Sequence, residues 1–530
     1  MGDATKPNFI VFLTDQQRWD HLGCYGNEVL KTPNIDALAD QGTRFDKFYV
    51  SSPLCQPNRA TLMTGRTPMV HGVRTNGIAL DRDAVTFVDL LRAAGWRTAL
   101  FGKSHLQNVT GRPPGPRPPA NPDRRAPPAE LQEAMRRRRN GPDYDAEVNP
   151  KWHEDPHRAV PKMPYYGYDT VRLAASHSDR VQGDYTSWFN ARHPDPDSLR
   201  GKANAIPDDT ISVVQSWRTS IPEELYPTAY VANETINYLK YHQESAEGRP
   251  FFVTCSFPDP HHPFTPPGKY WDMYNPDDIP VPVSHHKPMT IDDMPPGLWF
   301  AYEKGAAEPD AQWPVPVSAR HAQEAIALNY GMISMVDDAV GRVLESLTPE
   351  VRANTVIIFT SDHGDYMGDH GVILKLGLHF QGVVRVPFVW QDPEGTKGEV
   401  RQDLGGTIDI GATVLARAGL QTYFGNQGHD LFDANLAPRK GILIDDHGMA
   451  VFKDPEAKAG LMSYITDKWR LSVWEGSDWG ELYNLAEDPE EMTNLWSDPD
   501  HGAMRQSLLH RLLREMISLR DRSLTPTSLA

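Results

Sequence analysis

Short apolar runs alternate with amphipathic segments along most of the chain. The first run, NFIVFLT from Asn8 to Thr14, lacks the alternation of a half-exposed strand and predicts a strand covered on both faces. The segment TPNIDALADQG, with Pro33 near its start and Gly42 at its end, predicts a short amphipathic helix. The same criteria predict strands in WRTALFG, PFFVTCSF and NTVIIFTSD, and helices in AVTFVDLLRAAG, HAQEAIALNYGMISMVDDAVGRVLESL and TIDIGATVLARAGL. Strands separated by helices predict an α/β fold with a mostly parallel sheet flanked by helices.

Two parts of the chain do not show this alternation of predicted strands and helices. Residues 107 to about 225 are rich in proline and arginine and show little periodicity, so we interpret them as an insertion on the rim of the sheet. Within it, we interpret the run from Arg136 to Arg139 as a solvated helix face. Residues 426–530 contain strand-like pieces, KGILIDD and MSYITDKWRLSVW, and a final helix, GAMRQSLLHRLLREMISLRD. We therefore expect a catalytic domain over residues 1–425 and a smaller C-terminal α+β domain over residues 426–530.

The terminal helix also bears on assembly. Its apolar positions, Leu508, Leu509, Leu512, Leu513 and Met516, follow a helical spacing. Such a face packs either on the domain's own core or on a second subunit. A homo-oligomer is therefore an open expectation.

Composition narrows the classes of partner. The chain has 53 Lys and Arg against 70 Asp and Glu, a formal net charge of −17, which argues against nucleic-acid and anionic-membrane binding. Its three cysteines, Cys24, Cys55 and Cys255, do not form the pattern of a disulfide framework. The start MGDATKPNFIVFLTDQQ lacks the features of a signal peptide. We expect a cytoplasmic enzyme-sized protein with no membrane segment.

Polar pairs follow two of the predicted strands. Asp15 and Gln16 come after the first strand, and Asp362 and His363 come after VIIFTS. Ligand crevices of parallel sheets lie beyond the carboxyl ends of the strands, so the two pairs should converge. A single Asp at a strand end usually caps a turn, but two such pairs favour a divalent cation held by oxygen donors and one imidazole.

A cysteine sits at an unusual place. In SSPLCQPNRATLMTG, Cys55 directly precedes a predicted helix that has Pro57 in its first turn and ends at Gly65. A helix N-terminus attracts anions and lowers the pKa of a thiol. From the residues alone, Cys55 is a nucleophile, a metal-supported thiolate or a small buried residue.

The stretch Cys55-Gln56-Pro57-Asn58-Arg59, followed by ATLMTG, resembles the Cys-x-Pro-x-Arg signature of the sulfatase family within the alkaline phosphatase superfamily. Asn58 departs from the Ser or Ala most often found there. Further stretches occur in the family's order: PNFIVFLTDQQR, TPNIDALADQGTRFDKFYV, GKSHL, PHHPF, TSDHGDYMGDHG, LKLGLHFQGVVRVPFV, TIDIGATVL and ELYNLAEDPEEMTNL. The resemblance implies an alkaline-phosphatase-like fold. It also implies that a formylglycine-generating enzyme oxidises Cys55 to formylglycine (3-oxoalanine), whose hydrated aldehyde is the nucleophile.

The resemblance also assigns roles to single residues. It implies one Ca²⁺ or Mn²⁺ ion bound by Asp15, Gln16, Asp362, His363 and the modified Cys55, with Gln16 in a slot that other members fill with Asp. The implied catalytic residues are Cys55 itself, Arg59 to hold the formylglycine, Lys103 and His105 to contact the sulfate oxygens and the formylglycine hydroxyl, and His261 and Lys375 to face the leaving-group oxygen. His262 is the neighbouring alternative to His261. Asn76, in RTNG, is either a substrate contact or a turn residue.

Three functions fit these residues. The first is hydrolysis of a small sulfate monoester, as in an arylsulfatase. The second is a phosphonate monoester hydrolase or phosphodiesterase of the same family, with the same metal and formylglycine. Lys103 and His105 favour the sulfatase, because phosphonate hydrolases usually carry other side chains there. The third, an inactive sulfatase-like protein that binds anions, is disfavoured because every implied nucleophile and metal position is present.

Overall fold

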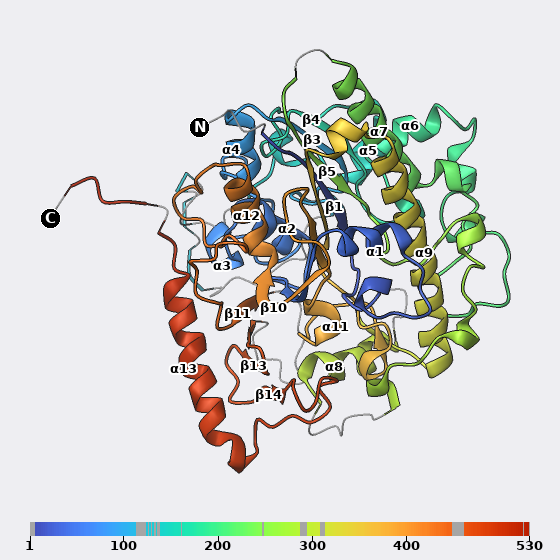
Figure 1. Cartoon of the computed structure of the whole chain (residues 1–530). Helices are drawn as coiled ribbons and strands as arrows, with labels where there is room; N and C mark the ends of the chain where they lie inside the picture. The colour runs from blue at the N-terminus through green and yellow to red at the C-terminus, as the bar shows by residue number, and fades with distance from the viewer. Residues whose placement is uncertain are drawn as a thin grey trace.

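An eight-stranded sheet in the order β10-β2-β9-β7-β1-β5-β3-β4 runs through the larger part of the molecule (Figure 1). The structure is a computed structural model that describes residues 6–112, 138–160, 162–245, 248–286, 294–307, 313–447, 460–522 and 524–528, with isolated positions between 123 and 134. Only β9 runs antiparallel to its neighbours, which confirms the predicted mostly parallel sheet. The strands are β1 (Asn8–Thr14), β2 (Thr43–Tyr49), β3 (Arg97–Gly102), β4 (Thr170–Leu173), β5 (Phe251–Ser256), β7 (Thr355–Ser361), β9 (Phe388–Gln391) and β10 (Glu399–Gly406).

The central strand β1 shows why its sequence does not alternate. Ile10 and Phe12 pack into the core on one face of the sheet. Phe9, Val11 and Leu13 pack into the core on the other face. Every side chain of the strand is buried, so both faces select apolar residues.

Helices cover both faces of this sheet (Figure 1). One layer contains α1 (Pro33–Asp40), α7 (Pro227–Glu244) and α9 (Ala319–Glu345), and the other contains α2 (Cys55–Thr64), α4 (Phe87–Ala93) and α12 (Ile410–Arg417). The remaining helices are α3 (Pro68–His71), α5 (Asn149–Glu154), α6 (Asp184–Asn190), α8 (Pro296–Phe300), α10 (Pro349–Arg352), α11 (Gln381–Val384) and α13 (Gly502–Ser518). Within the described ranges, no helix has the length and apolar character needed to span a membrane.

The segment from residue 107 to 225 adds an edge to the sheet. It supplies β4, which pairs in parallel with β3, and the short helices α5 and α6. Arg136 and Arg137 lie outside the described residues. The prediction of a solvated helix face is wrong for the described end of the run: Arg138 and Arg139 are not helical, and Arg139 Nη1 donates to the carbonyl of Ala79 at 2.8 Å.

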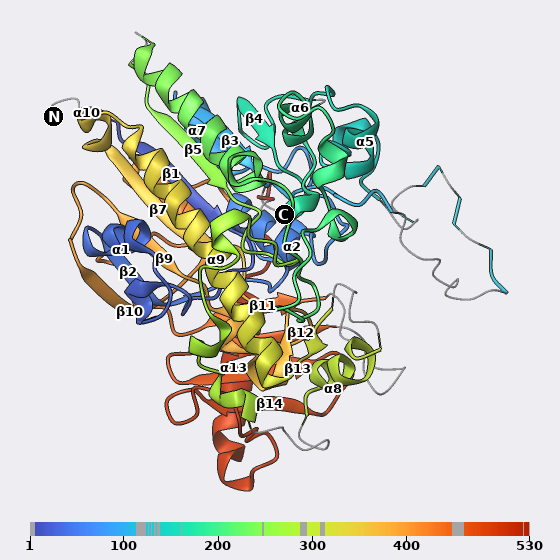
Figure 2. The ribbon, with the colours of Figure 1, turned by 90° about the vertical axis from the view of Figure 1, so that its right-hand side faces the viewer.

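A second, antiparallel sheet lies beside the first (Figure 2). It contains β11 (Ile442–Asp446), β12 (Leu461–Ile465), β13 (Trp469–Trp474) and β14 (Gly480–Asn484), in sequence order. Helix α13 packs its buried Leu508 and Leu512 against this sheet, so that part of its apolar face serves the domain's own core. The boundary at residue 425 and the oligomeric state stay predictions. A short ladder of β6 (Val315–Pro316) and β8 (Val372–Ile373) completes the strands.

Candidate active site

The carboxyl ends of four neighbouring strands meet at one place, as the polar pairs predict. Asp15 follows β1, Lys103 follows β3, His261 comes shortly after β5, and Asp362 follows β7. The strand order β7-β1-β5-β3 makes these strands adjacent. All four side chains are buried, so the cluster lies inside the protein rather than on its rim.

Helix α2 carries Cys55 into this cluster. The helix begins at Cys55 itself, with Leu54 as an extended N-cap, and ends before Gly65, whose φ of 56° suits glycine. Cys55 is only 1% exposed. Its Sγ lies 3.6 Å from Asp15 Oδ1, 3.0 Å from His363 Nε2 and 3.0 Å from Lys375 Nζ. Basic side chains and a carboxylate thus surround the sulfur atom of Cys55.

This environment stabilises negative charge at residue 55. Burial alone would raise the pKa of the Cys55 thiol, but the charges of Lys103, Lys375 and His363 hold that pKa well below its usual range. The position is therefore an anion site in the folded protein.

Two buried carboxylates differ in their partners. Burial and the nearby charge of Asp362 raise the pKa of Asp15 to about 7, although Asp15 forms an ion pair with Lys103. Burial would also raise the pKa of Asp362, but its ion pair with Arg59, 2.6 Å from Oδ2 to Nε, brings that pKa below its ordinary value. His363 Nε2 lies 3.6 Å from Oδ1 of each carboxylate.

Gln16 and His363 present acceptor atoms to the same space. The Nδ1–H of His363 donates to the carbonyl of Gly364 at 2.9 Å, so Nε2 is the ring nitrogen that faces the site, where a bound cation would take the place of its proton. The side-chain Nε2 of Gln16 donates to Asp365 and lies 3.0 Å from Nδ1 of His262, whereas Gln16 Oε1 is buried without a hydrogen-bond partner. A buried amide oxygen without a partner is costly unless something binds it. Two carboxylates, this oxygen and the imidazole fit a divalent cation.

Arg59 lies behind the carboxylates. Besides Asp362, its Nη1 donates to the carbonyl of Lys103 at 2.7 Å and to Ser256 Oγ at 2.9 Å. The guanidinium thereby ties α2 to the ends of β3, β5 and β7.

Lys103 and His105 enter from the loop after β3. Lys103 Nζ donates to Asp15 and, at 2.7 Å, to Nε2 of His177. His105 is 4% exposed with a φ of 53°, and burial lowers its pKa. The carboxylate of Glu147 accepts from the backbone N–H of His105 at 2.5 Å, and it also accepts from the next two N–H groups at 3.0 Å. Glu147 therefore holds this loop in its uncommon conformation.

The two adjacent histidines after β5 have different contacts. His261 Nε2 accepts from Lys375 Nζ at 2.9 Å, and its Nδ1–H donates to the carbonyl of His262. His262 instead lies against Gln16. The structure thus places His261, rather than His262, beside Lys375 and Cys55. The Nζ of Lys375 lies 2.8 Å from His363 Nε2 as well.

Asn76 lies at the start of α2. It is exposed, and its side-chain oxygen accepts from the backbone N–H of Gln56 at 3.2 Å. The residue therefore caps the helix that carries Cys55, and it borders the cluster rather than lying inside it.

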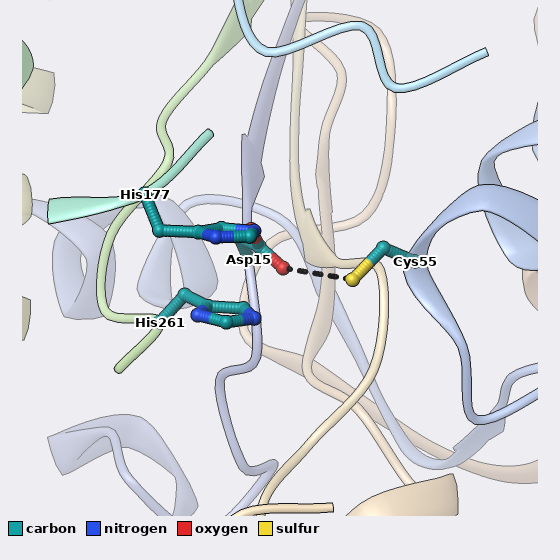
Figure 3. A group of neighbouring side chains, drawn as sticks. All are labelled: Asp15, Cys55, His177 and His261. Carbon is teal, nitrogen blue, oxygen red and sulfur yellow. Dashed lines mark hydrogen bonds and ion pairs between the residues drawn. The ribbon is translucent and has the colours of Figure 1, made fainter. Parts of the chain in front are cut away.

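His177 is the site residue that sequence reasoning missed. Its ring lies over that of His261, with centroids 3.5 Å apart and planes 7° from parallel, and both rings reach towards Asp15 and Cys55 (Figure 3). His177 comes from the segment AASHSDR, inside the stretch without periodicity, so no pattern distinguished it from other histidines.

Comparison with known proteins identifies the family of this chain. The model of the family described as Sulfatase matches residues 7–420, and a second model, described as N-sulphoglucosamine sulphohydrolase, C-terminal, matches residues 368–518. The chain belongs to the sulfatase family. The match covers most of the chain and confirms the predicted family and a sulfuric ester hydrolase as the class of enzyme.

Individual sulfatase-like proteins resemble the whole chain. An arylsulfatase of Clostridium perfringens is 28% identical over 96% of this chain and 94% of its own. A multifunctional alkaline phosphatase superfamily protein of Trinickia caryophylli is 26% identical over 98% of this chain and 97% of its own. The crystal structure of a phosphonate monoester hydrolase of Agrobacterium radiobacter superposes with a TM-score of 0.73 at 26% identity, over 98% and 97% of the two chains. This likeness confirms the alkaline-phosphatase-like fold of a sulfatase.

Proposed function

We propose that this sulfatase hydrolyses a small sulfate monoester, such as an aryl sulfate, with a divalent metal ion and a formylglycine made from Cys55. The observation that carries the proposal is the position of Cys55 Sγ, at the start of α2 and within 3.0 Å of both Lys375 Nζ and His363 Nε2. A nucleophile at this atom would meet its substrate among basic side chains.

Those charges suit an anionic ester. A sulfate monoester carries a negative charge, which repels an incoming nucleophile. Three buried cations, Arg59, Lys103 and Lys375, lie around residue 55 and offset that repulsion. A preorganised donor of this kind typically contributes about 3 kcal/mol to the stability of a transition state.

The metal and the modified side chain have separate tasks. Asp15, Gln16, Asp362 and His363 would hold Ca²⁺ or Mn²⁺, which would supply Lewis-acid polarisation at residue 55. The hydrated aldehyde of formylglycine supplies two hydroxyl groups, one to attack sulfur and one whose deprotonation releases the sulfate. A plain thiol cannot provide the second group.

The hydrogen-bond pattern supports Lys375 as the residue that protonates the leaving group. His261 keeps a proton on Nδ1, which faces the His262 carbonyl, and its Nε2 accepts from Lys375. Lys375 carries protons 3.0 Å from Cys55 Sγ, and we assign it the protonation of the departing oxygen. His105, which burial keeps neutral, is suited to accept the proton that sulfate release requires.

A phosphonate monoester hydrolase or phosphodiesterase is the second candidate. It is favoured by the similarity to the hydrolase of Agrobacterium radiobacter. Lys103 and His105 favour the sulfate reaction, because they put a cation and an imidazole where sulfatases contact the sulfate oxygens.

One experiment separates these candidates. The protein is produced with and without a formylglycine-generating enzyme, and peptide mass spectrometry at residue 55 measures conversion of the cysteine. Turnover of an aryl sulfate and of a phenyl phosphonate is then compared at identical metal loading, with Cys55→Ala as the control. We expect turnover only in the converted protein and a preference for the sulfate. A large preference for the phosphonate would overturn the sulfatase assignment, and no turnover by converted, metal-loaded protein would favour an anion-binding protein.

A further inference from the structure

His177 contacts three residues of the proposed reaction, one of which is Asp15, whose Oδ2 lies 3.5 Å from His177 Nε2. Its Nε2 accepts from Lys103 Nζ at 2.7 Å, and its ring stacks on His261. Its side chain is 16% exposed, whereas those of Asp15 and Lys103 are at most 1% exposed. His177 is therefore the most exposed member of this group.

A second metal site does not explain the group. Ligand atoms of Asp15, Cys55, His177 and His261 lie within 4.8 Å of one another. However, a ring nitrogen binds metal through a lone pair in the plane of its ring, and the two rings are parallel planes 3.5 Å apart. A metal bound by both rings would have to lie out of each ring plane by about half that spacing. This displacement is most of the length of a ~2.1 Å metal–nitrogen bond, so neither lone pair would point at the metal. Both Nε2 atoms, moreover, already accept from lysines.

The backbone around His177 is built to hold its side chain in place. Ser176 and Ser178, on either side, have φ values of 81° and 54°, a region that non-glycine residues seldom adopt. The hydroxyl of Ser178 donates to the carbonyl of His261 at 3.0 Å, which links the loops of the two stacked histidines. The next residue, Asp179, is buried and accepts from Trp217 Nε1 at 2.7 Å. Strain of this kind persists where surrounding contacts enforce it, and it is concentrated at functional sites.

Each ring of the stacked pair accepts a hydrogen bond from a different lysine. Lys103 donates to His177, and Lys375 donates to His261. Of the three N–H donors of the Lys103 ammonium, one goes to Asp15 and one to His177. One donor is left for a substrate oxygen, and the two partners fix its direction.

We propose that His177 is a positioning residue of the sulfatase reaction, which aims the Lys103 ammonium at the sulfate group through the hydrogen bond at Nε2. The proposal rests on the proposed function, because it takes from that function the anionic ester that Lys103 meets. The hydrogen bond is the working contact, and the stacking on His261 keeps the imidazole in the orientation that makes it.

Two substitutions separate the hydrogen bond from the stacking. His177→Gln retains an acceptor that can reach Lys103 but removes the aromatic ring. His177→Phe retains a ring for His261 but removes the acceptor. His153→Phe, on the exposed face of α5 in the same part of the chain, is the matched control. All variants are produced with the formylglycine-generating enzyme, loaded with the same metal and checked for conversion of Cys55 and for thermal unfolding.

We expect His177→Phe to lower kcat/KM for an aryl sulfate by at least about tenfold, the loss typical of removing a partner that orients a site residue. Inorganic sulfate should inhibit this variant more weakly by a similar factor, because Lys103 acts on the sulfate oxygens. His177→Gln should stay within about threefold of the wild-type protein. The loss in His177→Phe should be the same for good and poor leaving groups, and the control should match the wild-type protein.

Three results would overturn the inference: wild-type kinetics in His177→Phe, an equal loss in His177→Gln, or a loss that grows with the basicity of the leaving group. Each of these presupposes an active wild-type enzyme. An inactive but fully converted wild-type protein contradicts the proposed function instead, so the two failures are distinguishable.

Discussion

The fully buried charges of the site add up to a preference for anions. Asp15 and Asp362 contribute two negative charges, and Arg59, Lys103 and Lys375 contribute three positive ones, all with at most 5% exposure. A buried charge is tolerated when it is paired, and Asp15 pairs with Lys103 as Asp362 does with Arg59. Lys375 is the exception, since its neighbours are Cys55 and two imidazoles. Its charge lies directly against the reacting atom, where only a negative group can balance it.

Gln16 should contribute directly to metal affinity. Its Oε1 is the buried acceptor without a partner, so Gln16→Ala should weaken Mn²⁺ binding by at least about tenfold, measured by isothermal titration calorimetry. Gln16→Asp places a further carboxylate beside Asp365, so it should lower the unfolding temperature without metal and raise it more than in the wild-type protein when Mn²⁺ is added. Unchanged Mn²⁺ affinity in Gln16→Ala would show that Gln16 does not bind the metal.

Lys375 should act on the leaving group, unlike His177. Replacing it by Met removes a proton donor 3.0 Å from Cys55 Sγ, and kcat should fall by roughly 10²–10³ for an aryl sulfate. The loss should increase with the pKa of the leaving phenol, because a poorer leaving group depends more on protonation. The measurement is kcat across a series of substituted phenyl sulfates, with Lys397→Met, an exposed lysine, as the control. An equal loss across the series would assign Lys375 to the sulfate oxygens instead.

At the scale of helices and strands, the elements that could be predicted from the sequence are the buried ones. Strand β1 and helix α9 are buried over long stretches, so burial dictates their apolar patterns, and the parallel topology then brings Asp15 and Asp362 together. Glu147 and His177 were not predicted. Both lie between residues 107 and 225, where turns and short helices leave no periodic pattern. Their contacts, Glu147 with the N–H of His105 and His177 with Lys103, join segments far apart in the sequence, which composition does not reveal.

Asn58, at the start of α2, likewise makes contacts that the sequence pattern does not predict. Asn58, which departs from the family's usual Ser or Ala, is fully buried and bridges three segments. Its Oδ1 accepts from Ser51 N at 3.0 Å and from Thr407 Oγ1 at 2.7 Å, and its Nδ2 donates to the carbonyl of Asp362 at 2.6 Å. The amide thus fastens the helix of Cys55 to the end of β7.

Asn58→Ala should therefore destabilise the protein. The substitution leaves three buried polar groups without this partner, which should cost about 2–4 kcal/mol in the free energy of unfolding. Denaturant unfolding measures the effect, and Asn435→Ala, at an exposed asparagine, serves as the control. A change as small as that of the control would show that the contacts of Asn58 do not hold α2 in place.

At the scale of the whole molecule, the C-terminal sheet supports the loop that carries Lys375. Buried Arg470 on β13 pairs with Glu481 and Glu491. The Oε2 of Glu491 accepts from the backbone N–H of Gln381 at 2.8 Å, and His379 Nδ1 lies 2.7 Å from Ser463 Oγ on β12. A buried polar network thereby connects the smaller sheet to the active site.

This network predicts a dependence of stability on pH. One buried arginine faces two carboxylates, and burial raises the pKa of Glu491 from 4.5 to about 7 despite the charge of Arg470. Because the folded state then binds the proton more tightly than the unfolded state, the stabilising contribution is complete below pH 4.5 and is lost as the pH rises through about 7. The loss amounts to at most about 3 kcal/mol. Glu491→Gln cannot titrate, so the free energy of unfolding should fall less between pH 5 and pH 8 than in the wild-type protein.

Glu491→Gln also loses an acceptor, and this shifts its stability by a similar amount at every pH, so the slope and not the absolute value carries the test. Denaturant unfolding at several pH values gives the slope, and the exposed Glu487→Gln is the matched control. If Glu491→Gln and the wild-type protein have the same slope, Glu491 is ionised in the fold throughout this range, and Arg470 pairs with two charged carboxylates. A flatter slope, in contrast, means that the contact between the C-terminal sheet and the loop of Lys375 is made by a protonated carboxyl at acidic and near-neutral pH and by a charged one above it.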